Sequence, residues 1–241
     1  MNLNNIKTNI NVLLEYIGIL NKMKGNHIND VILKAKSIVP DLRLFNSEYK
    51  ISDKGSNGKK IEESLFGNKP NSISEPDLPF LGIDIKATKF KRLKKLGFNA
   101  KERLTITNIG ASNDMNSFNN IINNTLEECK AFKKFRKILL IVTDLDNKLL
   151  GIVLFEYEKL SEEYKKQIQD DYIDIQTKIK NNEISQKGQE FLHIHSHGSK
   201  QSFTKALGFK NKFITKIFGE LCNYNVVETS NHCYLTNNSV T

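Results

Sequence analysis

The sequence predicts an α+β fold, with one central mixed sheet flanked by helices, in a single domain covering residues 1–241. Apolar residues recur at helical spacing near the start of the chain. Short runs rich in Ile, Leu and Val follow in the middle, two of them joined by a hairpin signal. Hydrophobic residues make up 39% and charged residues 26%, which is ordinary for a globular chain long enough to bury one sizeable core.

Three helices are predicted in the first third of the chain. The spacing of apolar residues predicts helices over 11–23 and 28–38, and the second stops before Pro40. A shorter helix over 59–66 ends at Gly67. The apolar positions of the first helix are Val12, Leu13, Tyr16, Ile17, Leu20 and Met23.

Strands and further helices alternate through the rest of the chain. Residues 144–147, Asp-Leu-Asp-Asn, form the hairpin signal, and Ser161 is the predicted cap of a long helix reaching about residue 180. Two further helices are predicted over 118–135 and 213–223. The predicted strands are 81–88, 103–109, 137–143, 149–157, 191–195 and 226–235.

The chemistry of the chain is concentrated around an Asp-x-Lys pair. Asp84 and Lys86 lie two residues apart, so both side chains leave one face of a strand, while Ile85 points to the core. Most such pairs are solvated strand edges. Here Asp77 precedes the pair in a Pro- and Ser-rich loop and Glu62 lies on a short helix, so several carboxylates and one ammonium are available. Carboxylates hold hard cations such as Mg²⁺, which suits phosphodiester hydrolysis.

These residues follow a known order. Lys54, Gly55, Gly58, Glu62, Asp77, Asp84 and Lys86 match the pattern K-G-x-x-G-x-x-x-E, D, then (E/D)-x-K. The chain here resembles the MutH family, which comprises a mismatch-repair nicking endonuclease and related GATC-cutting restriction enzymes of the PD-(D/E)xK superfamily. Asp84 stands where the family usually has Glu. The likeness continues through 101–104, 133–142 and 170–194. It implies a restriction-endonuclease-like fold, Mg²⁺, double-stranded DNA and a short palindromic site, GATC or a relative.

The resemblance also implies roles. Asp77 and Asp84, with the Ile85 carbonyl, would bind Mg²⁺, and Lys86 would orient or help deprotonate the attacking water. Glu62 would be either a further metal ligand or the residue that holds Lys86 in place. Lys134 is a candidate for a second phosphate-stabilising cation, and a plain phosphate contact is the alternative.

Positive charge favours a polyanionic partner. The net charge is +9, and Lys and Arg gather in three segments, 86–103, 130–137 and 200–216. Each segment alone is typical of a solubilising loop, but three of them beside a metal-site motif favour a DNA-facing surface. The candidate DNA-binding residues are Lys59, Lys89, Lys91, Arg92, Arg103, His195, His197 and Lys200.

Histidines replace the basic residues that family members carry after the late strand. His193, His195 and His197 alternate, so on a strand three imidazoles could share a face and bind zinc. Two alternatives stand beside that one. His195 and His197 could donate to base edges or phosphates in a DNA groove, or the segment could be a polar loop.

Several classes are disfavoured. No apolar run reaches the ~20 residues that span a bilayer, and the polar start of the chain gives no signal peptide. Three widely spaced cysteines suit a reducing cytoplasm. We therefore expect a cytoplasmic, Mg²⁺-dependent restriction endonuclease that acts as a monomer or homodimer on DNA. A partner-dependent repair nickase and a catalytically silent DNA-binding module are the rivals.

Overall fold

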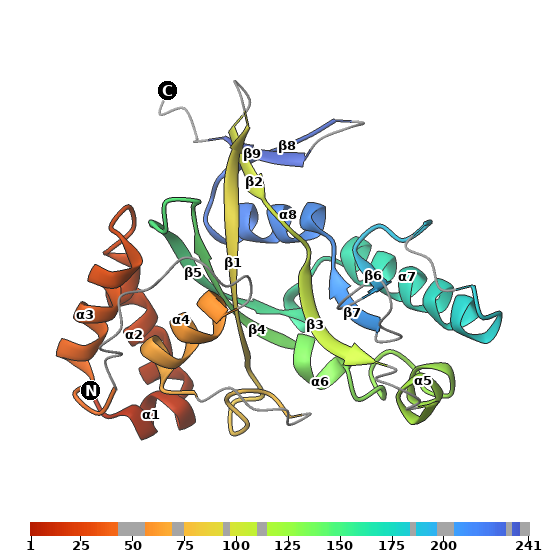
Figure 1. The fold of residues 1–241 in the computed structure, drawn as a ribbon, viewed down its shortest axis with the longest axis horizontal. Helices are drawn as coiled ribbons and strands as arrows, with labels where there is room; N and C mark the ends of the chain where they lie inside the picture. Colours follow the sequence, from red (N-terminus) through yellow and green to blue (C-terminus); the bar gives the residue numbers. More distant parts are fainter. Residues whose placement is uncertain are drawn as a thin grey trace. The chain divides into compact units, whose positions relative to one another are not determined.

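The computed structural model describes residues 1–42, 56–68, 75–93, 97–109, 115–183, 187–196, 205–229 and 233–236. It confirms the α+β fold (Figure 1). The chain divides into two compact units: Met1–Lys91 with Ile138–Phe155, and Arg92–Lys137 with Glu156–Thr241. That the two units serve as one nuclease domain stays a prediction.

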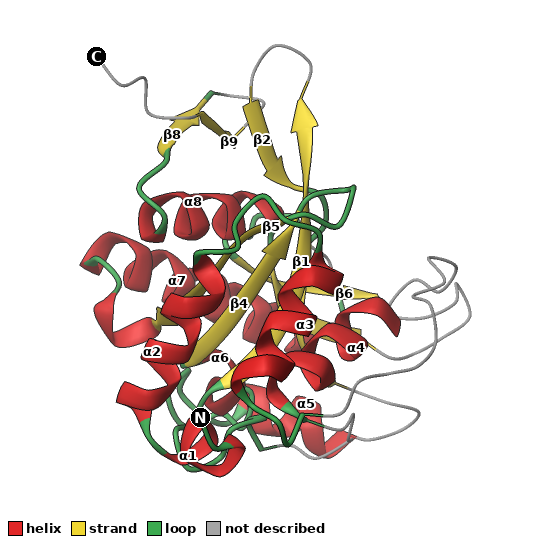
Figure 2. Cartoon of the chain, turned by 90° about the vertical axis from the view of Figure 1, so that its left-hand side faces the viewer, coloured by secondary structure: helices red, strands yellow, loops and turns green. Residues whose placement is uncertain are grey.

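Four helices build one side of the first unit: α1 (Leu3–Thr8), α2 (Ile10–Asn21), α3 (Ile28–Ile38) and α4 (Ser56–Phe66). The Asn9 side chain caps α2 by accepting the amides of Asn11 and Val12. The buried apolar residues of each helix lie on one face, which packs into the core of this unit. Figures 1 and 2 show these helices against the strands of the same unit.

The strands of the first unit are ordered β5 (Leu149–Glu156), β4 (Lys137–Thr143) and β1 (Asp84–Leu93). β1 and β4 run parallel, with Asp84 opposite Ile138 and Lys89 opposite Thr143. β4 and β5 form the predicted hairpin, and Asn147 takes a positive φ of 60° in its turn. Apolar residues of these strands and of α1–α4 form a single buried core.

The second unit contains two sets of antiparallel strands. The three-stranded sheet has the order β3 (Leu104–Ile109), β7 (Lys205–Phe209), β6 (Leu192–Ser196). The other antiparallel strands have the order β2 (Gly97–Ala100), β9 (Cys233–Thr236), β8 (Asn225–Glu228), and they belong to the six-stranded order β5-β4-β1-β2-β9-β8. Its helices are α5 (Met115–Ile122), α6 (Phe132–Phe135), α7 (Glu162–Lys180) and α8 (Asn211–Leu221), with a 3₁₀ turn over Tyr157–Lys159. Ser161 caps α7 as predicted, since its hydroxyl accepts the Tyr164 amide.

Three sequence predictions need correction. The helix predicted over 118–135 is broken into α5 and α6, because Tyr172 and Gln176 of α7 take the carbonyls of Ile121 and Asn124. The strand predicted over 226–235 is a hairpin of β8 and β9. The strand predicted over 81–88 starts only at Asp84, since the residues before it form a tight turn. Three elements, α1, β2 and β7, were not predicted.

Candidate active site

A six-residue turn leads into the site. Leu78 and Ile83 pair as an antiparallel bridge, and their backbones exchange hydrogen bonds of 2.8 and 3.2 Å. Gly82 supplies the positive φ of 65° that closes the turn, a conformation that suits glycine. The turn thereby brings its two flanking residues, Asp77 and Asp84, to its base.

Asp84 and Lys86 form an ion pair on one face of β1. The Asp84 side chain is fully buried and Lys86 is 20% exposed, while Ile85 between them lies in the core. The alternation predicted for this strand is confirmed. Burial alone lowers the pKa of Lys86, but the neighbouring carboxylates, Asp84 foremost, outweigh it and raise that pKa. Lys86 is therefore a cation at neutral pH.

Glu62 and Asp77 lie along one edge of the same strand. The Asp77 Oδ2 atom accepts the Ile85 amide at 2.9 Å, and the Glu62 Oε1 atom accepts the Ala87 amide at 3.2 Å. Alternate residues of a strand direct their backbone groups to the same edge, so these two carboxylates share one edge with the Ile85 carbonyl. That carbonyl also accepts the Lys86 ammonium at 3.3 Å.

The site holds more negative than positive charge. Burial, together with Asp77 and Asp84, raises the pKa of Glu62 to about 7, although Lys86 and the Ala87 amide oppose the shift. Among the described residues, these three carboxylates thus interact with the Lys86 ammonium. A low-dielectric site with excess negative charge attracts a cation.

The donor set fits a hard divalent cation. Asp77, Asp84, Glu62 and the Ile85 carbonyl offer only oxygen, which suits Mg²⁺ or Ca²⁺ better than zinc. Among the residues that the structure describes, no three acidic, His or Cys side chains are gathered as a finished metal site. The Asp77 and Glu62 bonds to the strand use one carboxylate oxygen each, and a cation at Asp84 would compete with Lys86 for that carboxylate.

The predicted DNA-binding residues lie in several places. Lys59, on α4 of the first unit, is exposed, as are Arg92 and Arg103 of the second unit, and Lys91 is partly exposed. Lys89 donates to Asn147 at 2.7 Å. His197 and Lys200 lie outside the described residues. Lys134 is partly exposed on α6 and belongs to the second unit, whereas the carboxylates belong to the first. Its catalytic role stays a prediction.

The two described histidines of the late strand are buried. His193 and His195 are 1% and 2% exposed, and their rings stack at 4.7 Å on one face of β6. Gly208 of β7 permits a close approach of β3 and of the His195 ring, since a Cβ there would lie 2.5 Å from the Leu104 carbonyl oxygen and 3.2 Å from His195 Cε1. Burial lowers the pKa of His193 to about 3, helped by His195 and by the positive charges of Arg103 and Lys210. A role of His195 at a base edge remains a prediction that requires the ring to become accessible.

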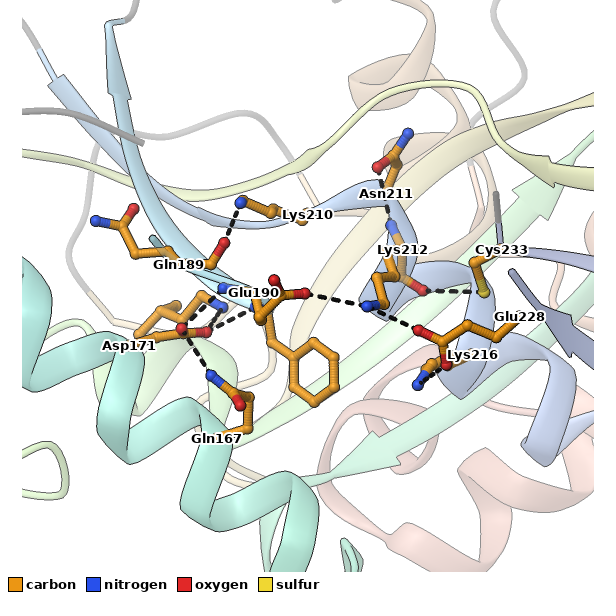
Figure 3. Close-up of polar contacts among 12 residues, drawn as sticks. Gln167, Asp171, Gln189, Glu190, Lys210, Asn211, Lys212, Lys216, Glu228 and Cys233 are labelled. Carbon is orange, nitrogen blue, oxygen red and sulfur yellow. Dashed lines mark hydrogen bonds and ion pairs between the residues drawn. The ribbon is translucent and has the colours of Figure 1, made fainter. Parts of the chain in front are cut away.

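A residue without a predicted role, Asp171 of α7, fixes the start of β6 (Figure 3). Its carboxylate is 1% exposed and accepts the amides of Glu190, Phe191 and Leu192 at 2.8, 2.6 and 2.8 Å, and Gln167 Nε2 at 3.1 Å. Burial raises the pKa of Asp171, and the three amides oppose that shift. Its helical phase with the buried residues Ile168, Tyr172 and Ile175 is the sequence signal that marks it as an inward-facing acid.

Ion pairs extend the same region. Lys212 of α8 pairs with Glu190 at 3.0 Å and with Glu228 of β8 at 2.7 Å, and Glu228 also pairs with Lys216 (Figure 3). These groups are partly exposed, so their contribution to stability is small. They nevertheless join the start of β6 to α8 and β8 within the second unit.

Comparison with known proteins agrees with this geometry. Residues 66–171 match the family model described as DNA mismatch repair enzyme MutH. This region is MutH-like. The type II restriction enzyme Sau3AI of Staphylococcus aureus is 40% identical over 65 residues, which cover 27% of this chain and 13% of that enzyme.

The MutH-like region contains Asp77, Asp84, Lys86 and Lys134, and it ends at Asp171. Glu62 precedes it, and the β6 histidines follow it. The match therefore includes the Asp-x-Lys strand and the turn before it. The resemblance predicted from the motif is confirmed, while the roles of the individual residues stay predictions. None of the helices in the described part of the chain is long and apolar enough to cross a membrane.

Proposed function

We propose that this chain is a Mg²⁺-dependent DNA endonuclease of the type II restriction kind, which hydrolyses phosphodiester bonds at a short palindromic site. The observation that carries the proposal is the gathering of Glu62, Asp77, Asp84 and Lys86 around one strand of a MutH-like region. GATC is the target that the family resemblance favours. The restriction type rests on the similarity to a type II restriction enzyme.

In this proposal Asp77, Asp84 and the Ile85 carbonyl hold the divalent cation, with Glu62 as a further ligand. When bound, the cation supplies Lewis-acid activation of water and of the phosphoryl oxygen. Lys86, once displaced from Asp84, donates hydrogen bonds to the water and to the negative charge that builds on the phosphate. Lys86 would thereby orient the attacking water or help to deprotonate it.

Basic residues on both units would contact the DNA backbone. Lys59, Lys91, Arg92 and Arg103 are accessible for this, and affinity should fall steeply with salt. A double-strand cut at a palindrome would need two chains on one site, or two successive nicks by one chain. We further propose a cytoplasmic location, consistent with three free cysteines among the described residues.

The test is incubation with unmethylated plasmid and Mg²⁺, followed by sequencing of the DNA ends. We expect discrete fragments that disappear with EDTA and in Asp84→Ala and Asp84→Asn, but not in Asp30→Asn, a control at an exposed acid of α3. Intact plasmid with binding retained would contradict the proposal and favour a silent DNA-binding module.

A second candidate is a repair nickase, because the matching family model is described as a mismatch repair enzyme. The same plasmid separates the two functions. Nicked circles without linear product, and a rate that rises strongly with partner proteins, would favour the nickase.

A further inference from the structure

An aromatic ring stands exposed beside the candidate active site. Phe80 is 81% exposed, more than any other large hydrophobic residue in the described part of the chain. Burying such a side chain contributes roughly 1.5–3 kcal/mol, so its exposure forgoes a stabilising contribution. Single exposed apolar residues are common, and the backbone beneath Phe80 is what distinguishes it.

The turn that carries Phe80 is fixed at several points. Leu78 and Ile83 are fully buried at its base, and the Leu81 and Gly82 amides donate to the carbonyls of Leu78 and Pro79 at 3.0 and 3.2 Å. Pro79 itself restricts one backbone angle beside the ring. The exposure of Phe80 is thus set by an ordered turn.

The place of the turn links the ring to the chemistry. Phe80 is three residues after Asp77 and four before Asp84, and the Leu78–Ile83 bridge brings both carboxylates to the base of the turn. Three residues of chain span at most about 11 Å between Cα atoms, so the tip of the turn lies within about that distance of Asp77. The ring can therefore reach a nucleotide next to one whose phosphate lies at Asp77.

We propose that Phe80 is a positioning residue whose ring packs against the sugar or base of the nucleotide beside the scissile phosphate. It thereby holds that phosphate over Asp77 and Asp84. Apolar side chains serve proteins in this way by packing between or against bases. A lone ring is far smaller than the ~800 Å² that each partner gives to a stable protein interface, so DNA fits it better than a protein does. This inference rests on the proposed function.

The experiment has two readouts, and the cut is first mapped with the wild-type chain. In Mg²⁺, we expect Phe80→Ala to raise KM about tenfold, which lies within the range of an aromatic–base stack, with kcat changed less than about threefold. Phe80→Tyr should restore KM. The matched control is Leu145→Ala, since Leu145 is a 50% exposed apolar residue in the β4–β5 turn of the same unit.

The second readout reports on contact directly. DNA carrying 2-aminopurine on either side of the mapped cut is bound by Asp84→Asn, with and without Phe80→Ala. We expect a fluorescence change on binding that disappears when Phe80 is replaced. If Phe80 had a purely structural role, Phe80→Ala would lower the melting temperature and would not specifically remove the fluorescence change of 2-aminopurine.

The outcomes separate the two proposals. A wild-type chain that cuts, with Phe80→Ala matching it in KM and in fluorescence, overturns the role of Phe80 alone. A wild-type chain that never cuts overturns the proposed function and this inference together. A tenfold rise in KM with the loss of the fluorescence change, in a variant of unchanged melting temperature, supports the contact.

Discussion

The Asp171→Asn substitution tests whether a buried carboxylate fixes the start of β6. Asn has nearly the same shape as Asp, so the substitution leaves no cavity and changes only the hydrogen bonding. In the wild-type chain Oδ2 accepts the amides of Phe191 and Leu192, while Oδ1 accepts those of Glu190 and Gln167. An Asn side chain can present one oxygen and one amino group here. Two of the four donors therefore lose their acceptor and face another donor.

The magnitude follows from those two donors. A buried donor without a partner costs roughly 1–3 kcal/mol, so Asp171→Asn should lower the free energy of unfolding by about 2–6 kcal/mol. The matched control is Asp174→Asn, on the same helix. Asp174 accepts Lys178 and Gln189 at 2.7 Å each, but its side chain is 35% exposed, so we expect a loss of about 1 kcal/mol or less.

Urea unfolding followed by far-UV circular dichroism and by tyrosine fluorescence measures both losses. Two probes are needed because the chain has two compact units, which can unfold separately. A loss below about 1 kcal/mol for Asp171→Asn, equal to that of Asp174→Asn, would refute the view that the carboxylate fixes β6. Hydrogen exchange at Glu190, Phe191 and Leu192 should accelerate selectively if the view is right.

Three more predictions concern charged groups. The pKa of Glu62 is raised to about 7, so the folded chain keeps a proton that the unfolded chain loses near pH 4.5. Without metal, the free energy of unfolding should therefore fall as pH rises from 4.5 through 7. In urea titrations at pH 5 and 8, Glu62→Gln should remove up to about 3 kcal/mol of that loss. The pKa of His193 is lowered to about 3, so its contribution to stability is complete above pH 6.5 and is lost as pH decreases from 6.5 toward 3. His193→Phe should flatten this pH dependence of the free energy of unfolding. In the proposed mechanism Lys86 competes with the cation for Asp84, so Lys86→Met should tighten Mg²⁺ binding several-fold, as measured by calorimetry, and should abolish cutting. Lys59→Met is the surface control. Equal Mg²⁺ affinities of the two variants would contradict the competition.

Local sequence patterns predicted most of the first unit, and the reason is physical. The helix over 28–38 and the strand over 137–143 have the observed bounds, because their apolar spacing matches their burial. The Asp84–Lys86 pair was predicted from strand alternation alone. Each of these features depends on residues that are close in the sequence.

The missed features depend on contacts between distant residues. The helix predicted over 118–135 is interrupted because Gln176, more than fifty residues later, takes the Ile121 carbonyl. The helical spacing of residues 118–135 does not reveal that the Gln176 side chain bonds to this carbonyl. The role of Asp171 was not predicted for the same reason, since the backbone amides that it accepts begin nineteen residues later, at Glu190. The burial of His193 and His195 was not predicted because their strand pairs with β7, a strand that was itself not predicted.

The way β1 is hydrogen-bonded explains why acids gather around it. The Ile85 and Ala87 amides need acceptors, because a buried amide without one is costly. Asp77 and Glu62 meet this need with one oxygen each, so the strand itself holds two carboxylates in place. Lys86 forms an ion pair with Asp84, the position that the proposed cation would take. Folding and the proposed chemistry thus use the same carboxylates, and isosteric substitutions such as Glu62→Gln should therefore change stability and cation binding together.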